Sequence, residues 1–126
     1  MQALAIATSG VFIALGLLHF YWAAGGSSGK NAAVPEIAGA PAFKPTKAAT
    51  AAVGVALLGT ATIVLLRVDI LVAGAAAVLI LRAVGDFRLV GFFKRVRGTR
   101  FARLDTLLYS PLCLALGAAL ALVAAS

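Results

Sequence analysis

The stretch "KAATAAVGVALLGTATIVLLRVDILVAGAAAVLIL", residues 47–81, decides the fold class of this 126-residue chain. It contains two apolar runs separated by Arg67, Val68 and Asp69. A helix needs about 20 mostly apolar residues to cross a bilayer, and the first run is long enough. The whole chain is 63% hydrophobic and 12% charged, whereas a water-soluble domain has about 25% charged residues. The composition therefore predicts an integral membrane protein with a single domain.

Two further apolar segments lie outside this stretch, one on each side of it. The third of the four segments is short unless its helix continues past Arg82. The guanidinium of Arg82 can reach the headgroup layer while its stem stays in hydrocarbon. The predicted fold is all-α, a bundle of four transmembrane helices formed by residues 1–126. The spans are expected at about residues 3–23, 47–66, 69–88 and 105–124.

The basic residues predict how these spans are oriented. Four spans place both termini and Arg67 on one side of the membrane, and the loops 24–46 and 85–104 on the other. Of the 11 Lys and Arg residues, only Arg67 falls on the side of the termini. Cytoplasmic loops of membrane proteins are enriched in Lys and Arg. We therefore expect a multi-pass protein with both termini outside and two long cytoplasmic loops.

Small residues predict how the helices pack. An alanine or threonine recurs every four residues from Ala48 to Thr60, and the third span has further small residues around Gly74. Membrane helices associate through close packing at small residues. Because the connection between these two spans is very short, we expect them to form a tight antiparallel hairpin. Thr46 is expected to cap the second span, and Thr99 a helix that runs into the fourth.

The remaining polar residues collect at the predicted cytoplasmic end. The chain has four carboxylates, and two of them, Asp86 and Asp105, flank its most basic segment. Asp86 follows Arg82 by four residues, which places both on one helix face and predicts an ion pair. A carboxylate at the edge of a bilayer requires a cation or hydrogen-bond donors. The candidate ligand-binding residues are His19, Tyr21, Trp22, Glu36, Arg82, Asp86, Arg88, Asp105 and Tyr109.

Several of these residues also have a purely structural interpretation. Tyr21 and Trp22 are typical of the aromatic belt at a membrane interface. An ion pair between Arg82 and Asp86 can simply hold a helix end. His19 lies about one turn inside the first span, where a histidine usually faces the bundle and has a partner. Its sequence position fits both a structural and a proton-carrying role.

Two neighbours are expected beside Asp105, because Arg103 lies next to it in the sequence and Tyr109 lies one turn later. In the same span, Pro111 leaves the carbonyl near Leu107 without its helical hydrogen bond. The free carbonyl can bend the helix or line a cavity.

The other basic residues predict a lipid partner. Phenylalanines alternate with them between residues 87 and 101, as in segments that lie in the membrane interface. We expect anionic headgroups at Lys94, Arg95, Arg97 and Arg100. Nucleic acid is not expected as a partner. The single histidine and the single cysteine give no metal-ligand spacing, so no metal or cofactor is expected.

Motifs along nearly the whole chain resemble a family of small bacterial four-helix integral membrane proteins catalogued as a domain of unknown function. The motifs, in order, are "HFYWAAGG" at 19–26, "VPEIAG", "KPTKAAT", "LRAVGDFR", "GFFK" and "GTRFARLDTLLYSPLC". The resemblance implies the four-helix fold and a location in the bacterial cytoplasmic (inner) membrane. It implies no catalytic roles.

Three functions fit this layout. We first expect a binding protein that holds an anionic or amphipathic small molecule or lipid in a polar pocket at the cytoplasmic end, covered by the 24–46 loop. The second is a membrane enzyme on a lipid-soluble substrate, with His19 as general acid or base oriented by Asp86 or Asp105. The third is a homodimeric proton-coupled transporter or an accessory subunit, although no ionisable group lies near the predicted midplane. The sequence leaves the ligand, the enzymatic activity and the oligomeric state open.

Overall fold

The computed structural model describes residues 1–126 and is built from four long helices. The first three are α1 (Gln2–Ala23), α2 (Lys47–Leu65) and α3 (Asp69–Val84). The fourth runs without a break through α4 (Arg100–Leu104), the π-helical turn η2 (Asp105–Tyr109) and α5 (Ser110–Ala125). The loop after α1 contains a 3-10 turn, η1 (Asn31–Ala33), and two short paired strands, β1 (Glu36–Ile37) and β2 (Ala40–Pro41). The all-α prediction is confirmed.

Three of the long helices are apolar and long enough to cross a membrane, namely α1, α2 and the helix Arg100–Ala125. The helix α3 has 16 residues and ends at Val84, so the predicted extension to Arg88 is wrong. Gly85 adopts a φ of 93°, a left-handed conformation that stops the helix. The chain then folds back, and the N–H of Phe92 donates to the carbonyl of Ala83 at 2.7 Å.

Both predicted helix caps are present. The hydroxyl of Thr46 accepts a hydrogen bond from the N–H of Ala49 at 3.0 Å, and the hydroxyl of Thr99 accepts one from Ala102, also at 3.0 Å. Each bond satisfies one of the free N–H groups at a helix start. The start of α2 therefore agrees with the predicted span, and the fourth helix begins at Arg100 as expected.

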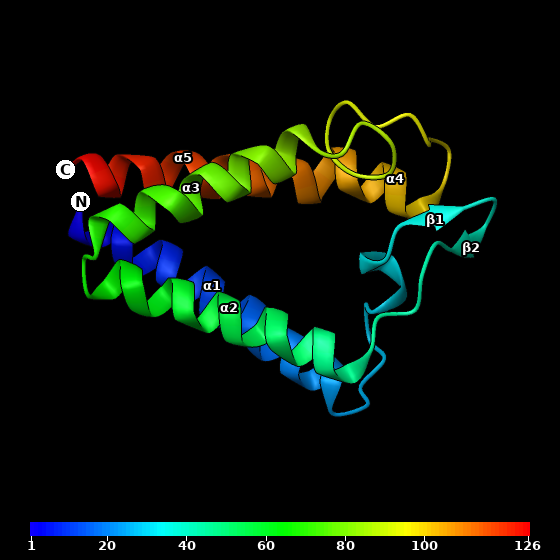
Figure 1. Cartoon of the computed structure of the whole chain (residues 1–126), viewed down its shortest axis with the longest axis horizontal. Coiled ribbons are helices and arrows are strands. Elements are labelled where there is room, and N and C mark those ends of the chain that lie inside the picture. Colours follow the sequence, from blue (N-terminus) through cyan, green and yellow to red (C-terminus); the bar gives the residue numbers. More distant parts are fainter.

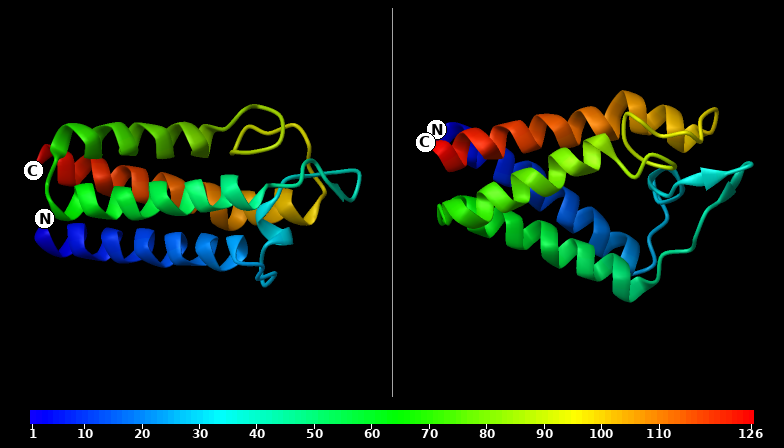
Figure 2. Two further views of the ribbon diagram at one scale, coloured as in Figure 1. Left: turned by 60° about the horizontal axis from the view of Figure 1, so that its bottom comes forward. Right: turned by 45° about the horizontal axis from the view of Figure 1, so that its top comes forward.

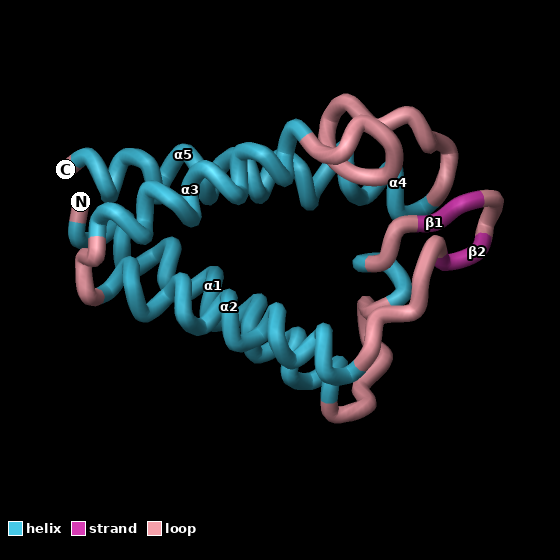
Figure 3. The backbone as a smooth tube through the Cα atoms, in the orientation of Figure 1, coloured by secondary structure: helices cyan, strands magenta, loops and turns pink.

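The helices pack as two antiparallel hairpins, α1 with α2 and α3 with α5 (Figure 1). The hairpins meet at the end that holds both termini and the α2–α3 turn, and they spread apart toward the other end (Figure 2). The molecule is therefore V-shaped, and the long loops gather at its wide end (Figure 3). The predicted hairpin of α2 with α3 is wrong, because these two helices make few contacts with each other.

Glycines explain this choice of helix partners. A Cβ atom on Gly16 would lie 3.2 Å from the carbonyl oxygen of Gly54, so α1 and α2 approach each other at these two positions. In the other hairpin, a Cβ atom on Gly117 would lie 2.8 Å from the side chain of Ile80. Small residues thus bring helices together, as expected. They pair α2 with α1 instead of α3.

The apolar core lies toward the narrow end and draws on all four long helices. Its nine buried residues are Ala5, Phe12, Ala61, Val64, Val72, Ala76, Leu116, Leu120 and Val123. The guanidinium of Arg67 donates to the carbonyl of Val123 at 3.0 Å and to the hydroxyl of Ser126 at 2.8 Å. These contacts tie the α2–α3 turn to the end of α5 and so hold the narrow end together.

Candidate functional site

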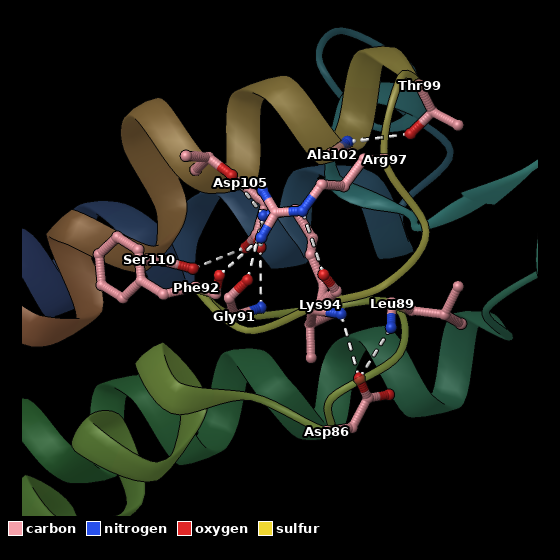
Figure 4. Close-up of polar contacts among 12 residues, drawn as sticks. Asp86, Leu89, Gly91, Phe92, Lys94, Arg97, Thr99, Ala102, Asp105 and Ser110 are labelled. Carbon is pink, nitrogen blue, oxygen red and sulfur yellow. Dashed lines mark hydrogen bonds and ion pairs between the residues drawn. The ribbon is translucent and has the colours of Figure 1, made fainter.

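Asp105 is the polar centre of the wide end (Figure 4). Its side chain is 0% exposed. One carboxylate oxygen accepts from Arg82 at 2.8 Å and from the Ser110 hydroxyl at 3.1 Å. The other accepts from the N–H of Gly91 at 2.8 Å and lies 3.0 Å from the ammonium of Lys94. The carboxylate thus has four donors and lies between two cations.

Asp86 does not pair with Arg82, so the predicted ion pair is wrong. Because α3 ends at Val84, Asp86 lies outside the helix. One of its carboxylate oxygens accepts from the backbone N–H groups of residues 88–90 at 2.8–3.2 Å. Burial would raise the pKa of the Asp86 carboxyl, but these donors outweigh burial and hold that pKa below its ordinary value. Asp86 organises the loop, and Arg82 is available to Asp105.

Lys94 also differs from its prediction as a base for lipid headgroups. Its side chain is buried, and its ammonium donates to the carbonyl of Gly91 at 3.0 Å and to the hydroxyl of Thr106. The reason is the fold of the loop: a Cβ atom on Gly91 would lie 2.3 Å from the carbonyl oxygen of Val84. The loop is thus packed closely against the end of α3, and within it Lys94 points inward to Gly91 and Asp105. The other three predicted headgroup contacts, Arg95, Arg97 and Arg100, are exposed.

The π-helical turn η2 holds Asp105 in place. Pro111 has no N–H to donate to the carbonyl of Leu107, and the N–H of Ser110 instead donates to the carbonyl of Asp105, five residues earlier. Such a widened turn is frequent at functional sites. The expected neighbours of Asp105 are wrong as partners, because Arg103 is exposed and the hydroxyl of Tyr109 donates to another acceptor.

A pocket of about 400 Å³ lies between the two hairpins at the wide end, and we call it the mouth pocket. His19 and Trp22 line it from α1, Arg82 from α3 and Tyr109 from η2, together with part of the 24–46 loop. The Tyr109 hydroxyl donates to the carbonyl of Ala32 at 2.7 Å, which ties this loop to the fourth helix. The structure thus brings together four of the predicted site residues from three elements.

Arg82 connects the mouth pocket to Asp105. One terminal nitrogen of its guanidinium donates to Asp105, while the other is buried and has no hydrogen-bond partner. A buried donor without a partner is uncommon in proteins. The cluster of Arg82, Lys94 and Asp105 also has two cations and one carboxylate, hence one excess positive charge. Both features favour an additional anionic acceptor.

His19 is oriented by the backbone. Its Nδ1 lies 2.7 Å from the carbonyl oxygen of Leu15. Because a carbonyl oxygen only accepts, Nδ1 must carry the proton, and in the neutral ring Nε2 is then an acceptor. The ring packs edge-on against Trp22 with 4.9 Å between centroids. Asp86 and Asp105 are bonded elsewhere, so neither orients His19 as the enzyme hypothesis requires.

The remaining predicted residues lie outside the mouth pocket. Tyr21, Asp86 and Arg88 are exposed. Glu36 accepts from the N–H of Phe101 at 3.3 Å, which attaches β1 to the start of the fourth helix. No group of three His, Cys, Asp or Glu side chains is arranged to hold a metal ion.

Sequence reasoning missed two residues of the cluster around Asp105. Lys94 and Ser110 were not among the candidates. For Ser110 there was no usable signal, because residues five positions apart lie on different faces of an α-helix, and only the π-helical turn brings its hydroxyl to Asp105. For Lys94 the only signal was the pair of glycines at 85 and 91, which indicates a tight loop without giving its path.

Comparison with known proteins gives one match. No curated protein and no solved structure matches the chain. Residues 12–120 match a family described as "Protein of unknown function (DUF3995)". This match covers most of the chain and agrees with the resemblance to an uncharacterised membrane family. The chain therefore belongs to the DUF3995 family of proteins of unknown function.

Proposed function

We propose that this chain is a four-span membrane protein that binds an anionic amphipathic molecule in the mouth pocket. The observation that carries the proposal is the unpartnered terminal nitrogen of Arg82 in a site with one excess positive charge. An oxyanion bound beside Arg82 in the mouth pocket would balance the charge, and a turn of the guanidinium toward it would give the buried nitrogen its missing acceptor. A hydrogen bond between two charged groups is about twice as strong as a neutral one.

Helix length and charge support the proposed location. Three helices have the length and composition of membrane spans. At about 1.5 Å per residue, the 16 residues of α3 extend about 24 Å, and in a hydrocarbon core about 30 Å thick Arg82 would then lie near one face. We propose that the wide end faces the bacterial cytoplasm, because ten of the 11 basic residues lie there. Arg95, Arg97 and Arg100 would then contact anionic lipid headgroups.

The walls of the mouth pocket support an amphipathic ligand over a simple ion. Leu15, Leu18 and two alanines of the loop line it beside the polar residues. The indole N–H of Trp22 already donates to the carbonyl of Ser28 at 2.8 Å. Trp22 therefore contributes its apolar aromatic ring to the pocket, and no free donor. A pocket with mostly apolar walls and a few fixed polar groups is typical of small-molecule sites.

Replacing Arg82 by lysine tests this proposal. Lysine keeps a charge beside Asp105 but has only one terminal nitrogen, so the unpartnered donor is lost. We expect Arg82→Lys to bind dodecyl phosphate about ten-fold or more weakly than the parent protein, since a hydrogen bond to a charged group contributes about 1.5–3 kcal/mol. Isothermal titration of the protein held in amphipathic polymer measures this affinity.

Arg88 provides the matched control, because it is also an arginine of the wide end but is exposed and lies outside the mouth pocket. We expect Arg88→Lys to bind as the parent does. Equal affinities for the parent and Arg82→Lys would show that the mouth pocket is not the anion site.

A further inference from the structure

A second pocket lies nearer the middle of the long helices. This inner pocket has a volume of about 280 Å³ and is lined by α1, α2 and α3. Phe12, Leu57 and Leu79 are among its walls, and seven of its eight lining residues are hydrophobic. The exception, Thr60, donates its hydroxyl to the carbonyl of Ala56 at 2.8 Å. The inner pocket therefore offers no unsatisfied hydroxyl to a ligand.

The inner pocket and the mouth pocket follow each other along the same helix faces. On α3 the lining positions are 75, 78 and 79 in the inner pocket and 82 in the mouth pocket. This spacing of three, four and seven residues is that of one helix face. On α1, Phe12 lines the inner pocket and Leu15 lines the mouth pocket one turn later. The apolar inner pocket and the mouth pocket with its cationic group thus lie in succession along α1 and α3.

We infer that the ligand is a lipid whose anionic headgroup binds Arg82 and whose hydrocarbon chain lies in the inner pocket. This inference rests on the proposed function and adds the chemical class of the ligand. The polar mouth matches a phosphate or a carboxylate, and the apolar inner pocket matches an alkyl chain. Phe12, only 1% exposed, forms part of its wall. When the hydrocarbon chain moves from water or from the more loosely packed bilayer into this pocket, its atoms gain close contacts with fixed side chains, which favours binding.

The dependence of affinity on chain length tests this inference. The probes are alkyl phosphates from hexyl to dodecyl and the corresponding alkyl carboxylates. Burying one methylene from water strengthens binding about four-fold. We expect the affinity of the parent protein to rise with chain length and then level off once the inner pocket is filled. A preference for the phosphates indicates a phospholipid, and a preference for the carboxylates indicates a fatty acid. The inference is supported if, in either series of probes, the affinity rises with chain length and then levels off.

Filling the inner pocket supplies the matched comparison. Ala75→Leu adds bulk at a wall of the inner pocket, while Ala77→Leu makes the same change on the exposed face of α3. We expect Ala75→Leu to bind hexyl phosphate as the parent does and to lose at least ten-fold for dodecyl phosphate. Ala77→Leu should retain both affinities. Ala56→Leu adds the same bulk from α2, so the test does not depend on one variant folding.

The outcomes separate this inference from the proposed function. If Arg82→Lys weakens every probe but chain length has no effect in the parent, the anion site stands and the lipid inference is overturned. Equal losses in Ala75→Leu and Ala77→Leu would also overturn it. If chain length matters but Arg82→Lys changes nothing, the anion site fails, and the placement of the headgroup fails with it.

Discussion

At the scale of single residues, the buried carboxylate of Asp105 is the centre of the ion pairs at the wide end. It is the one acid that faces both Arg82 and Lys94. Removing one partner of a buried ion pair is costly because the remaining charge stays buried without compensation. The same cluster therefore stabilises the wide end and orients the guanidinium that we propose to bind the ligand.

Asp105→Ala should lower the free energy of unfolding by about 3–5 kcal/mol, because it leaves two cations without their carboxylate. Chemical unfolding in mild detergent measures the loss. The matched control is Asp69→Ala, which removes an exposed ion pair with Arg67 at 3.3 Å and should cost at most about 1 kcal/mol. Similar losses in the two variants would contradict a stabilising role for the cluster.

Asp86 predicts a dependence of stability on pH. Its pKa is held below the ordinary value by three backbone donors, so its ionised form stabilises the fold. This contribution is present above the unfolded pKa of about 3.9 and is lost as the pH falls through the lower folded pKa. The difference in melting temperature between the parent and Asp86→Ala should therefore shrink below about pH 4. A difference that stays constant down to about pH 2 would contradict this role.

The gathering of polar residues at one end of the molecule was partly predictable from the sequence. Scarcity of charge indicated that His19, Arg82 and Asp105 would gather at one end, and they do. Their pairing was not predictable, because Arg82 and Asp105 are separated by 23 positions. The expected partner of Arg82, Asp86, is only four residues away. Asp86 does not pair with Arg82 because Gly85, which lies between them, ends the helix.

At the scale of elements, the contact between Gly16 and Gly54 determines which helices form a hairpin. A Cβ atom on Gly54 would lie 3.1 Å from the ring of Phe20 and 3.2 Å from the carbonyl oxygen of Gly16. A larger side chain there would force α1 and α2 apart.

Gly54→Leu should therefore lower the free energy of unfolding by about 1–3 kcal/mol, the usual cost of overpacking. The control is Gly59→Leu on the same helix, where an added Cβ atom meets nothing within 4 Å. Thermal unfolding followed by circular dichroism compares the two variants. A larger loss for Gly59→Leu would contradict the assigned packing.

Helix boundaries were more predictable than helix partners. Thr46 and Thr99 cap their helices as expected because a cap depends only on residues three positions away. The choice of partner depends on which faces meet, and small residues occur on more than one face of α2. Sequence alone cannot decide whether α1 or α3 covers the face that contains Gly54.

At the scale of the whole molecule, the distribution of charge predicts orientation. Cys113 is the single cysteine, so a Cys113→Ser background allows single-cysteine labelling. We expect Ser126→Cys to react with a membrane-impermeant maleimide in intact bacterial cells, and Ser28→Cys to react only after lysis. The reverse pattern would place the wide end outside and contradict the proposed topology.

The divergence of the two hairpins has a mechanical consequence. In a bilayer, a body that is broader at one end occupies more cross-sectional area in one leaflet than in the other. Such a wedge relieves packing stress where a membrane bends in the matching sense. The protein should accordingly concentrate in small vesicles over large ones of identical lipid composition when the broad end faces the outer leaflet.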